Sequence, residues 1–324
     1  MAEASESRAQ QTQTSTSAAA RRLELGALAS AKPRSLWSDA WSQFRRHRLA
    51  MAGAFMLLFI CVAVLVGPFV WPKGTGNIDF ANGLRSPSLE HPMGTDDLGR
   101  DMFARVLTGG RISVAVGITA VIIAITLGTL IGALAGFFGG FLDSALMRFT
   151  DMALALPGLP LLLLTIYLFR DSLRDRFGAQ LGPFILIVAL IGLLNWMATA
   201  RLVRASFLSI REKEFIEAAH CIGASRSSII FKHILPNVLG PVIVAATIGV
   251  GAAIITESSL SFLGLGFPPD IPTWGQLLNT GRDWLEFAWW MVIFPGMMIF
   301  LTVLSINYVG DGLRDALDPR KNFG

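Results

Sequence analysis

The chain alternates long apolar segments with shorter polar ones. The first apolar segment, residues 49–71, runs for 23 positions without a charged side chain. A helix of roughly 20 residues crosses the hydrocarbon core of a bilayer, so this segment predicts a membrane span. Five similar segments follow, at 112–136, 152–169, 184–200, 238–256 and 289–309. The pattern predicts an all-α integral membrane protein with six transmembrane helices, whose even number puts both ends of the chain on one side.

Composition and cysteine usage agree with this class. Hydrophobic residues make up 53% of the 324 positions, charged residues make up 15%, and the mean hydropathy is +0.56. The segment 49–71 is longer than the apolar part of a signal peptide and lacks a small-residue cleavage site, so we expect it to remain as the first span. Cys61 and Cys221 lie in an apolar and a polar segment, which argues against a disulfide framework.

Positively charged residues indicate the orientation in the membrane. With the N-terminus inside, 18 of the 27 Lys and Arg residues lie in inside segments and nine lie in outside segments. Cytoplasmic segments of membrane proteins carry the excess of Lys and Arg. Both termini, and the polar segment 201–237, are therefore predicted to lie in the cytoplasm.

The N-terminal part divides into a polar tail and an amphipathic segment. Residues 1–33 are rich in Ser, Thr, Gln and Ala, a composition that predicts a disordered cytoplasmic tail. Residues 34–48 place two Trp residues and a Phe on one helical face and end in a cluster of Arg, which favours a helix lying in the membrane interface. A soluble amphipathic turn ahead of the first span is the alternative.

The motifs that would indicate catalysis are absent from the sequence. It contains no GxxxxGK[ST] loop, no G-x-S-x-G elbow and no H-E-x-x-H pair. The four His residues are scattered, so no metal site is predicted. Asn195 and Glu257 are the notable polar groups at span depth, fewer than a proton or sodium relay requires. We expect no enzyme activity in this chain, and a driving force supplied from outside it.

Four glycines recur every four positions in one predicted span and the turn after it, at 128, 132, 136 and 140. Such spacing lets the backbones of two membrane helices approach closely. Packing between helices of this same chain is the favoured interpretation, and a subunit interface or a moving gate is the alternative.

The polar segment 214–237 is patterned as two short helices. Gly223 is placed to adopt the positive φ that ends the first helix, Ser225 to cap the second, and Pro236 to stop it. Ala218 and Ala219 keep the first helix thin enough for the groove of another protein to close around it. A docking surface and a solvated connector both fit this pattern.

The same segment resembles the coupling-loop signature of permease subunits in binding-protein-dependent ABC importers. Its spacing is Glu217-Ala218-Ala219, three residues, Gly223, nine residues, His233, one residue, then Leu235-Pro236. The signature commonly has Ile where this chain has His233, a departure that the peptide branch of the family often shares. Three further segments, 91–113, 258–274 and 310–320, resemble that branch, and the resemblance covers about 45–324.

The resemblance implies a C-type permease of a dipeptide, oligopeptide or nickel importer, with the type I importer architecture. It makes 49–324 the transmembrane permease domain and 205–237 its cytoplasmic coupling loop. It implies a B-type permease partner, two ABC ATPase subunits that bind ATP and Mg, an extracytoplasmic binding protein, and a bacterial or archaeal plasma (inner) membrane. No cofactor and no nucleic acid is expected on this chain. The loop residues carried over from the signature and its surroundings are Glu217, Ala218, Ala219, Gly223, Ser225, His233, Leu235 and Pro236.

Competing functions stay open at this point. The same architecture serves importers of nickel or another small solute, and a self-contained secondary transporter or a membrane scaffold without a transport role would also fit a bundle of spans. It is also open whether Glu217 contacts the ATPase or braces the hairpin.

Two outer segments are candidates for a further role. Asp96, Arg100 and Asp101 bring opposite charges together ahead of the second span, and Asp96 is expected to cap a helix that holds Arg100 one turn later. An internally paired turn is favoured there over substrate contact. Residues 260–274, with Gly264, Gly266 and Trp274, predict an ordered outer loop that closes the outer mouth or contacts the binding protein. The charged residues 311–320 predict a short cytoplasmic cap.

Overall fold

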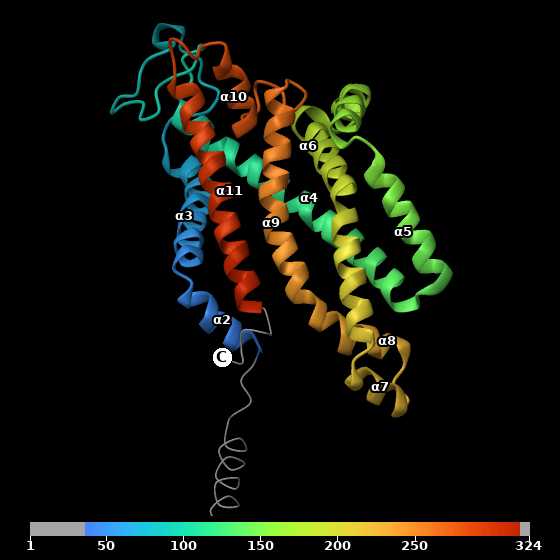
Figure 1. Ribbon diagram of the computed structural model, residues 1–324. Coiled ribbons are helices and arrows are strands. Elements are labelled where there is room, and N and C mark those ends of the chain that lie inside the picture. The colour runs from blue at the N-terminus through green and yellow to red at the C-terminus, as the bar shows by residue number, and fades with distance from the viewer. Residues whose placement is uncertain (1–35, 318–324) are drawn as a thin grey trace, which may run out of the picture. The chain divides into compact units, whose positions relative to one another are not determined.

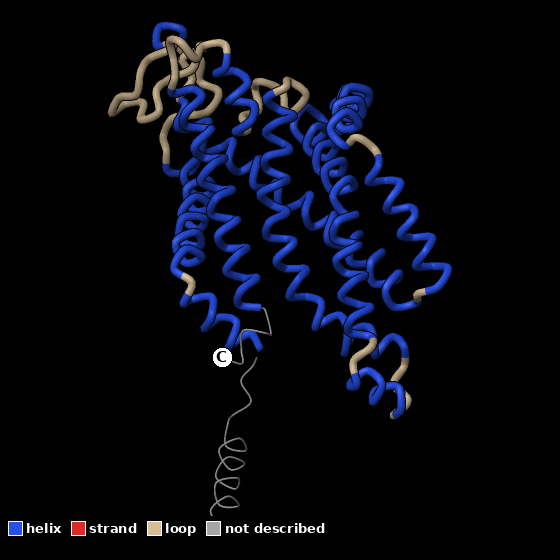
Figure 2. The backbone as a smooth tube through the Cα atoms, viewed as in Figure 1, coloured by secondary structure: helices blue, strands red, loops and turns tan. Residues whose placement is uncertain are grey.

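The computed structural model describes residues 36–317, which form helices joined by loops (Figure 2). The chain divides after Ser42 into two compact units, and all the membrane helices belong to the second. The predicted tail 1–33 and the last residues of the charged C-terminal segment lie outside the described range. The helices are α2 (Leu36–Arg46), α3 (Arg48–Val70), η1 (Phe80–Asn82), α4 (Met102–Phe138), α5 (Gly140–Ala155), α6 (Gly158–Arg211), α7 (Glu214–Cys221), α8 (Arg226–Ser228), η2 (Ile229–Ile234), α9 (Leu235–Phe262), α10 (Trp274–Arg282) and α11 (Trp290–Leu317).

Helix α2 occupies most of the segment for which an amphipathic helix was expected, and its location at a membrane surface stays a prediction. His47 separates it from α3, where its Nδ1 accepts a hydrogen bond of 3.1 Å from the amide of Ala50 and caps the first span.

Five described helices are long and apolar enough to cross a membrane, a count that takes α6 as a single helix. Six spans were predicted. Predicted spans 1, 2, 4, 5 and 6 lie within or along α3, α4, α6, α9 and α11. The predicted bounds of the span 152–169 are wrong, because the chain breaks at Leu156 and Pro157 between α5 and α6. Proline lacks an amide donor and keeps the residue before it out of the helical region. The 54 residues of α6 are two helical pieces, because Gly178 interrupts the helix with a φ of 86°. The chain turns so sharply there that a Cβ on Gly182 would lie 2.5 Å from the carbonyl oxygen of Leu173. Residues 158–169 belong to the piece of α6 that precedes Gly178.

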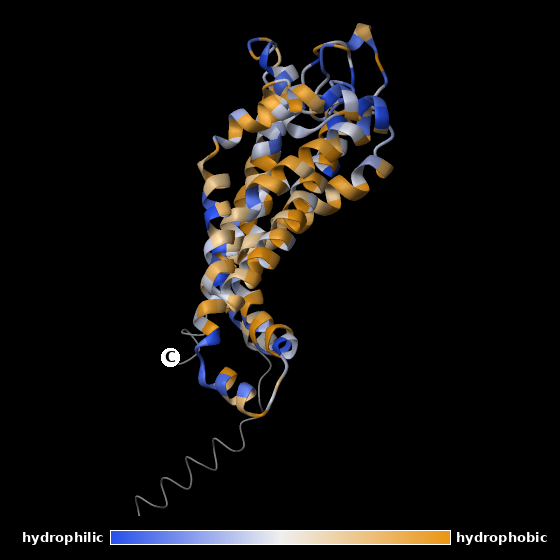
Figure 3. Cartoon of the chain, turned by 90° about the vertical axis from the view of Figure 1, so that its right-hand side faces the viewer, coloured by the Kyte–Doolittle hydropathy of each residue, from blue (hydrophilic) through white to orange (hydrophobic). Residues whose placement is uncertain are grey.

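Within the second unit, α3 lies beside α11, α9 follows in the middle, α4 crosses behind them, and α6 and α5 complete the row (Figure 1). Helices α7 and α8 lie at one end of this bundle, and α10 and the loop 72–101 lie at the other. Hydrophobic residues predominate along the middle of the bundle, and hydrophilic residues are more frequent at its two ends (Figure 3). Helix α3 begins and α11 ends at the α7–α8 end, in agreement with the expectation that both ends of the spanning part lie on one side.

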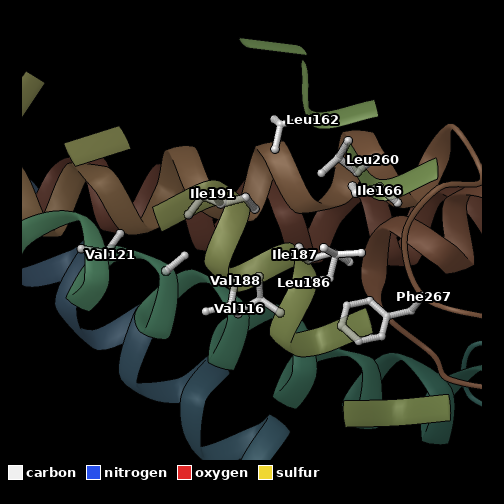
Figure 4. Close-up of a cluster of buried hydrophobic side chains, with 12 residues drawn as sticks. Val116, Val121, Leu162, Ile166, Leu186, Ile187, Val188, Ile191, Leu260 and Phe267 are labelled. Atoms are coloured by element: carbon white, nitrogen blue, oxygen red, sulfur yellow. The ribbon is translucent and has the colours of Figure 1, made fainter. Parts of the chain in front are cut away.

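A cluster of buried side chains holds α4, α6 and α9 together. Val116 and Val121 of α4, Ile187 and Ile191 of α6, and Leu260 of α9 point toward one another in it (Figure 4). Helices in a bilayer associate through such close packing, because burial from lipid supplies little hydrophobic free energy.

The glycine spacing in α4 serves packing within the chain, as favoured from the sequence. A Cβ on Gly128 would lie 2.6 Å from Cβ of Thr199, and one on Gly136 would lie 2.6 Å from Cβ of Phe207, both on α6. Gly140 differs, since it has a φ of 57° in the turn after α4 and would meet nothing within 4 Å. The stripe therefore joins α4 to α6.

Candidate functional site

The first candidate site is the loop of residues 212–234 that contains α7, α8 and η2, hereafter the α7–α8 loop. It is shorter than the predicted 205–237, because α6 continues to Arg211 and α9 begins at Leu235. Ile216 and Ala219 form the buried face of α7, with exposed fractions of 1% and 4%. They belong to one cluster with Phe207 of α6. Helix α7 is therefore seated on the end of the bundle by its apolar face.

Gly223 ends α7 as predicted. Its φ is 79°, and its amide donates to the carbonyl of His220 at 3.0 Å. The next amide, of Ala224, donates to the carbonyl of Ala219 at 3.0 Å. This pair of bonds is the Schellman motif, in which a glycine with positive φ satisfies the last carbonyls of a helix. The space around Gly223 is open, so the backbone conformation alone requires glycine.

Ser225 caps the second piece, also as predicted, since its Oγ accepts a hydrogen bond from the amide of Ser228 at 3.3 Å. The prediction that Pro236 stops this piece is wrong. The chain passes through the π-helix η2 directly into α9, and Pro236 lies in the first turn of α9. A wider turn accommodates a proline ring, because the amide of Leu235 reaches back five residues to Ile230. The end of the α7–α8 loop is therefore joined to α9 by uninterrupted helical backbone.

The opposite face of α7 is open to solvent. Glu217 and Ala218 are both exposed, and the Glu217 carboxylate forms no ion pair or side-chain hydrogen bond with the described residues. Three large apolar side chains around it are exposed as well: Phe215 by 47%, Ile222 by 85% and Phe231 by 63%. A face of this kind, on which large apolar side chains are exposed beside the Glu217 carboxylate, is suited to contact another protein.

The remaining residues of the signature, His233 and Leu235, are both half-buried. His233 is half-buried, and its carbonyl accepts a hydrogen bond of 2.7 Å from Asn237 Nδ2. Leu235 packs against the same cluster as Ile216. These residues hold the loop to α9.

Arginine side chains fix the base of the loop. Arg204 of α6 forms a two-pronged pair with Asp143 of α5, with Nη2 and Oδ2 2.6 Å apart. Arg211 donates to the carbonyl of Phe137 at the end of α4, at 3.0 Å. Bidentate arginine–carboxylate pairs set geometry as well as charge. The α7–α8 loop therefore stands on a braced junction of α4, α5 and α6.

The second candidate site is the outer polar network around Asp96, hereafter the outer network. Asp96 is 1% exposed and accepts hydrogen bonds from the amide and Nε of Arg100, at 2.8 and 2.7 Å. Arg105 Nε approaches the same carboxylate at 3.7 Å, and Arg105 Nη2 donates to the carbonyl of Pro269 at 3.1 Å. Substrate contact was the disfavoured interpretation here, and the observed pairing is internal.

The wrong aspartate was predicted as the N-cap of α4. Asp101, not Asp96, caps α4, accepting a hydrogen bond of 2.8 Å from the amide of Ala104. Its carboxylate also accepts a hydrogen bond from Trp71 Nε1 at 3.1 Å and lies 2.8 Å from Nδ1 of His91. Asp96 sits one turn earlier, where the chain is a tight loop and not yet helical. Two aspartates so close in sequence compete for one cap, and the start of α4 decides between them.

The ordered outer loop predicted at 260–274 is shorter in the structure, 263–273, because α9 ends at Phe262 and α10 begins at Trp274. It is anchored on Trp274 and Glu257. Both are fully buried. The Trp274 indole donates to the carbonyl of Val106 at 3.0 Å. The Glu257 carboxylate accepts hydrogen bonds from Ser261 Oγ at 2.7 Å and Ser113 Oγ at 3.1 Å.

Two glycines shape the turn of this loop. Gly264 has a φ of 81°, and a Cβ on Gly266 would collide with Ser261. Sequence reasoning missed Arg105 and Ser113, which carry the long-range bonds of the outer end. The available signal was Arg105 itself, the fourth residue of an apolar helix, because a buried charge requires a partner.

Two families of known proteins match parts of this chain. Residues 128–323 match the family described as binding-protein-dependent transport system inner membrane component, and residues 35–87 match the N-terminal TM domain of oligopeptide transport permease C. The dipeptide transport system permease protein DppC of Alkalihalophilus pseudofirmus is 39% identical over 88% of this chain and 90% of its own length.

Two more relatives and one structure agree. The oligopeptide transport system permease protein OppC of Escherichia coli is 42% identical over 89% of this chain and 92% of its own. The glutathione transport system permease protein GsiD of Escherichia coli is 40% identical, with coverages of 93% and 97%. The structure of the MetNI methionine ABC transporter in inward-facing conformations aligns with a TM-score of 0.53 at 20% identity, over 67% of this chain and 98% of that one. It supports the same fold.

Proposed function

The chain belongs to the family of binding-protein-dependent transport system inner membrane components, and from that premise we propose that it forms half of the path through which an ATP-driven importer brings in di- or oligopeptides. The relatives named for dipeptide, oligopeptide and glutathione transport support the peptide class. The observation that carries the coupling role is α7: buried on one face against the membrane helices and exposed, with the free Glu217 carboxylate, on the other.

The partners in this proposal are a second, B-type permease, two ATPase subunits that bind ATP and Mg²⁺, and an extracytoplasmic binding protein. An ATPase subunit would hold the exposed face of α7. Its closure would move α7 as a body, because Ile216 is packed against the end of α6 and η2 leads without interruption into α9. Tilting of α6 and α9 would then alternate access to the path.

A reconstituted complex tests the proposal. The chain, with its partner permease and ATPases, is placed in proteoliposomes, and uptake of a radiolabelled dipeptide is measured with the binding protein present. We expect accumulation that requires ATP, and its loss in Glu217→Lys and Gly223→Trp. Unchanged assembly and unchanged ATP-driven uptake in both variants would contradict the coupling role.

The same vesicles separate the competing functions. A nickel importer would accumulate Ni²⁺ with ATP and ignore the dipeptide. A secondary transporter would work as the isolated chain, driven by a proton gradient without nucleotide. A scaffold would leave uptake of each tested solute intact when the chain is deleted.

A further inference from the structure

Three hollows that share lining residues follow one another along α9 and are called the groove hereafter. The hollow nearest the α7–α8 end is lined by Gly240 and Arg314 among others and has a volume of about 390 Å³. It shares Leu202, Ala245 and Ile248 with the next hollow, of about 300 Å³. That one shares Asn195 with a third, of about 260 Å³, which extends to Leu263.

The groove is as long as a bilayer is thick. Its wall on α9 runs from Gly240 to Leu263, which is roughly 35 Å at about 1.5 Å per residue. The hydrocarbon core of a bilayer is about 30 Å thick. Small residues form its middle, where Ala245, Gly249 and Ala252 leave room beside α6.

Polar oxygens are exposed along the outer part of this groove. Asn195 Nδ2 donates to the carbonyl of Ile191 at 2.7 Å, Thr256 Oγ1 donates to Ala252 at 2.9 Å, and Ser259 Oγ donates to Ile255 at 2.8 Å. Each side chain thus donates a hydrogen bond to a carbonyl of its own helix, as such residues do in membrane helices. What remains facing the groove is mainly hydrogen-bond acceptors.

Other faces of the bundle are different. The outer face of α3 exposes large apolar side chains, among them Phe55 by 73%, Leu58 by 62% and Phe69 by 82%. That composition suits lipid. Asn195, Thr256 and Ser259 bring polar side chains to the groove, and polar residues within spans commonly face a bundle interior or a water-filled cavity. The groove therefore differs from the outer face of α3 in its smaller side chains and in its polar groups.

We propose that this groove is the wall that the chain contributes to the translocation path, and that Asn195, Thr256 and Ser259 bind the backbone N–H groups of a passing peptide. The assignment rests on the proposed function and names its substrate-contacting residues. Described residues lining the middle and outer hollows carry no charge, so the wall offers acceptors to any peptide backbone without choosing among side chains. Single neutral hydrogen bonds contribute little net free energy, which lets a solute leave as readily as it enters.

Cysteine accessibility in the assembled complex tests the groove without relying on transport. Cys61 and Cys221 are replaced by alanine, and single cysteines are placed at Ala252 and Ser259. Thr126 supplies the matched control for Ser259, since it is an exposed hydroxyl bonded to its own helix but flanked by Ile122 and Leu130, which are 59% and 57% exposed. A membrane-impermeant maleimide reacts with thiols that reach water.

The groove thiols are expected to react at least about tenfold faster than Thr126→Cys, because the reactive thiolate forms in water and not in lipid. Equal, slow rates at all three positions would overturn the assignment and mean that a partner permease or lipid covers this face. Because labelling needs no uptake, that failure is distinct from failure of the proposed function, which would appear as absence of ATP-driven dipeptide uptake by the wild-type complex.

Asn195→Leu gives the second readout. It keeps the side-chain size and removes the amide, so ATP hydrolysis and assembly should persist while dipeptide uptake per ATP falls about threefold to tenfold, the loss of roughly one hydrogen bond. Thr126→Val is the control and should leave that ratio unchanged. An Asn195→Leu complex with the wild-type ratio would overturn the role of the amide.

Discussion

Two acidic residues at opposite ends of the bundle, Asp96 and Glu217, have opposite surroundings. At the outer end, Asp96 and Arg105 are each 1% exposed and lie in one network of charges. At the α7–α8 end, Glu217 is exposed without an ion pair to the described residues. A buried, paired charge belongs to the architecture, whereas an exposed charge on a seated helix is available to a partner. Mutations at the two ends should therefore fail for different reasons.

Asp96→Asn should have the largest effect on folding. It leaves the buried guanidinium groups of Arg100 and Arg105 without their counter-charge, and breaking a buried pair costs about 3–5 kcal/mol. The unfolding temperature of the purified protein in detergent measures the loss. Asp283→Asn is the control, because its pair with Arg282 is exposed and contributes little. Equal unfolding temperatures for both variants would show that the outer network is not structural.

Gly132→Val should come next, at about 1–3 kcal/mol, the usual cost of overpacking. A Cβ there would lie 2.8 Å from Cβ of Val203 on α6. Gly158→Val is the matched control, since a Cβ at Gly158 meets nothing within 4 Å. The comparison uses denaturant unfolding of the detergent-solubilised protein. A stable Gly132→Val would mean that α4 and α6 separate more easily than their spacing indicates.

Ser225→Ala should have a smaller and local effect. Loss of an N-cap costs about 1 kcal/mol, so the amide of Ser228 should exchange its hydrogen about fivefold faster while the rest of the bundle is unaffected. Hydrogen exchange read by mass spectrometry on the loop peptide measures this. Ser227→Ala, at an exposed serine that is not a cap, is the control. An unchanged exchange rate at Ser228 would mean that the Ser225 side chain does not stabilise the loop.

Local chemistry was the part that the sequence predicted well. Gly223 and Ser225 act within one turn of the chain, so their roles follow from residue type and spacing. The break at Pro157 and the π-helix before Pro236 were missed. Hydropathy and spacing do not indicate whether a proline ends a helix or is accommodated by a local change in its hydrogen bonding. Arg105 and its bond to Pro269 were also missed, since 164 positions separate the two residues. The groove along α9 was not predicted, because its lining comes from four helices, α4, α6, α9 and α11, that are far apart in the sequence.

The central claim is that the exposed face of α7 is where a partner ATPase binds. Its most direct test is the affinity of the ATPase subunits for the purified chain carrying Glu217→Lys, compared with Glu286→Lys, the same charge change at an exposed outer position. We predict that Glu217→Lys weakens binding at least about tenfold, or roughly 1.4 kcal/mol, with an unchanged unfolding temperature, and that Glu286→Lys binds like the wild type. Equal affinities for both variants would contradict the claim.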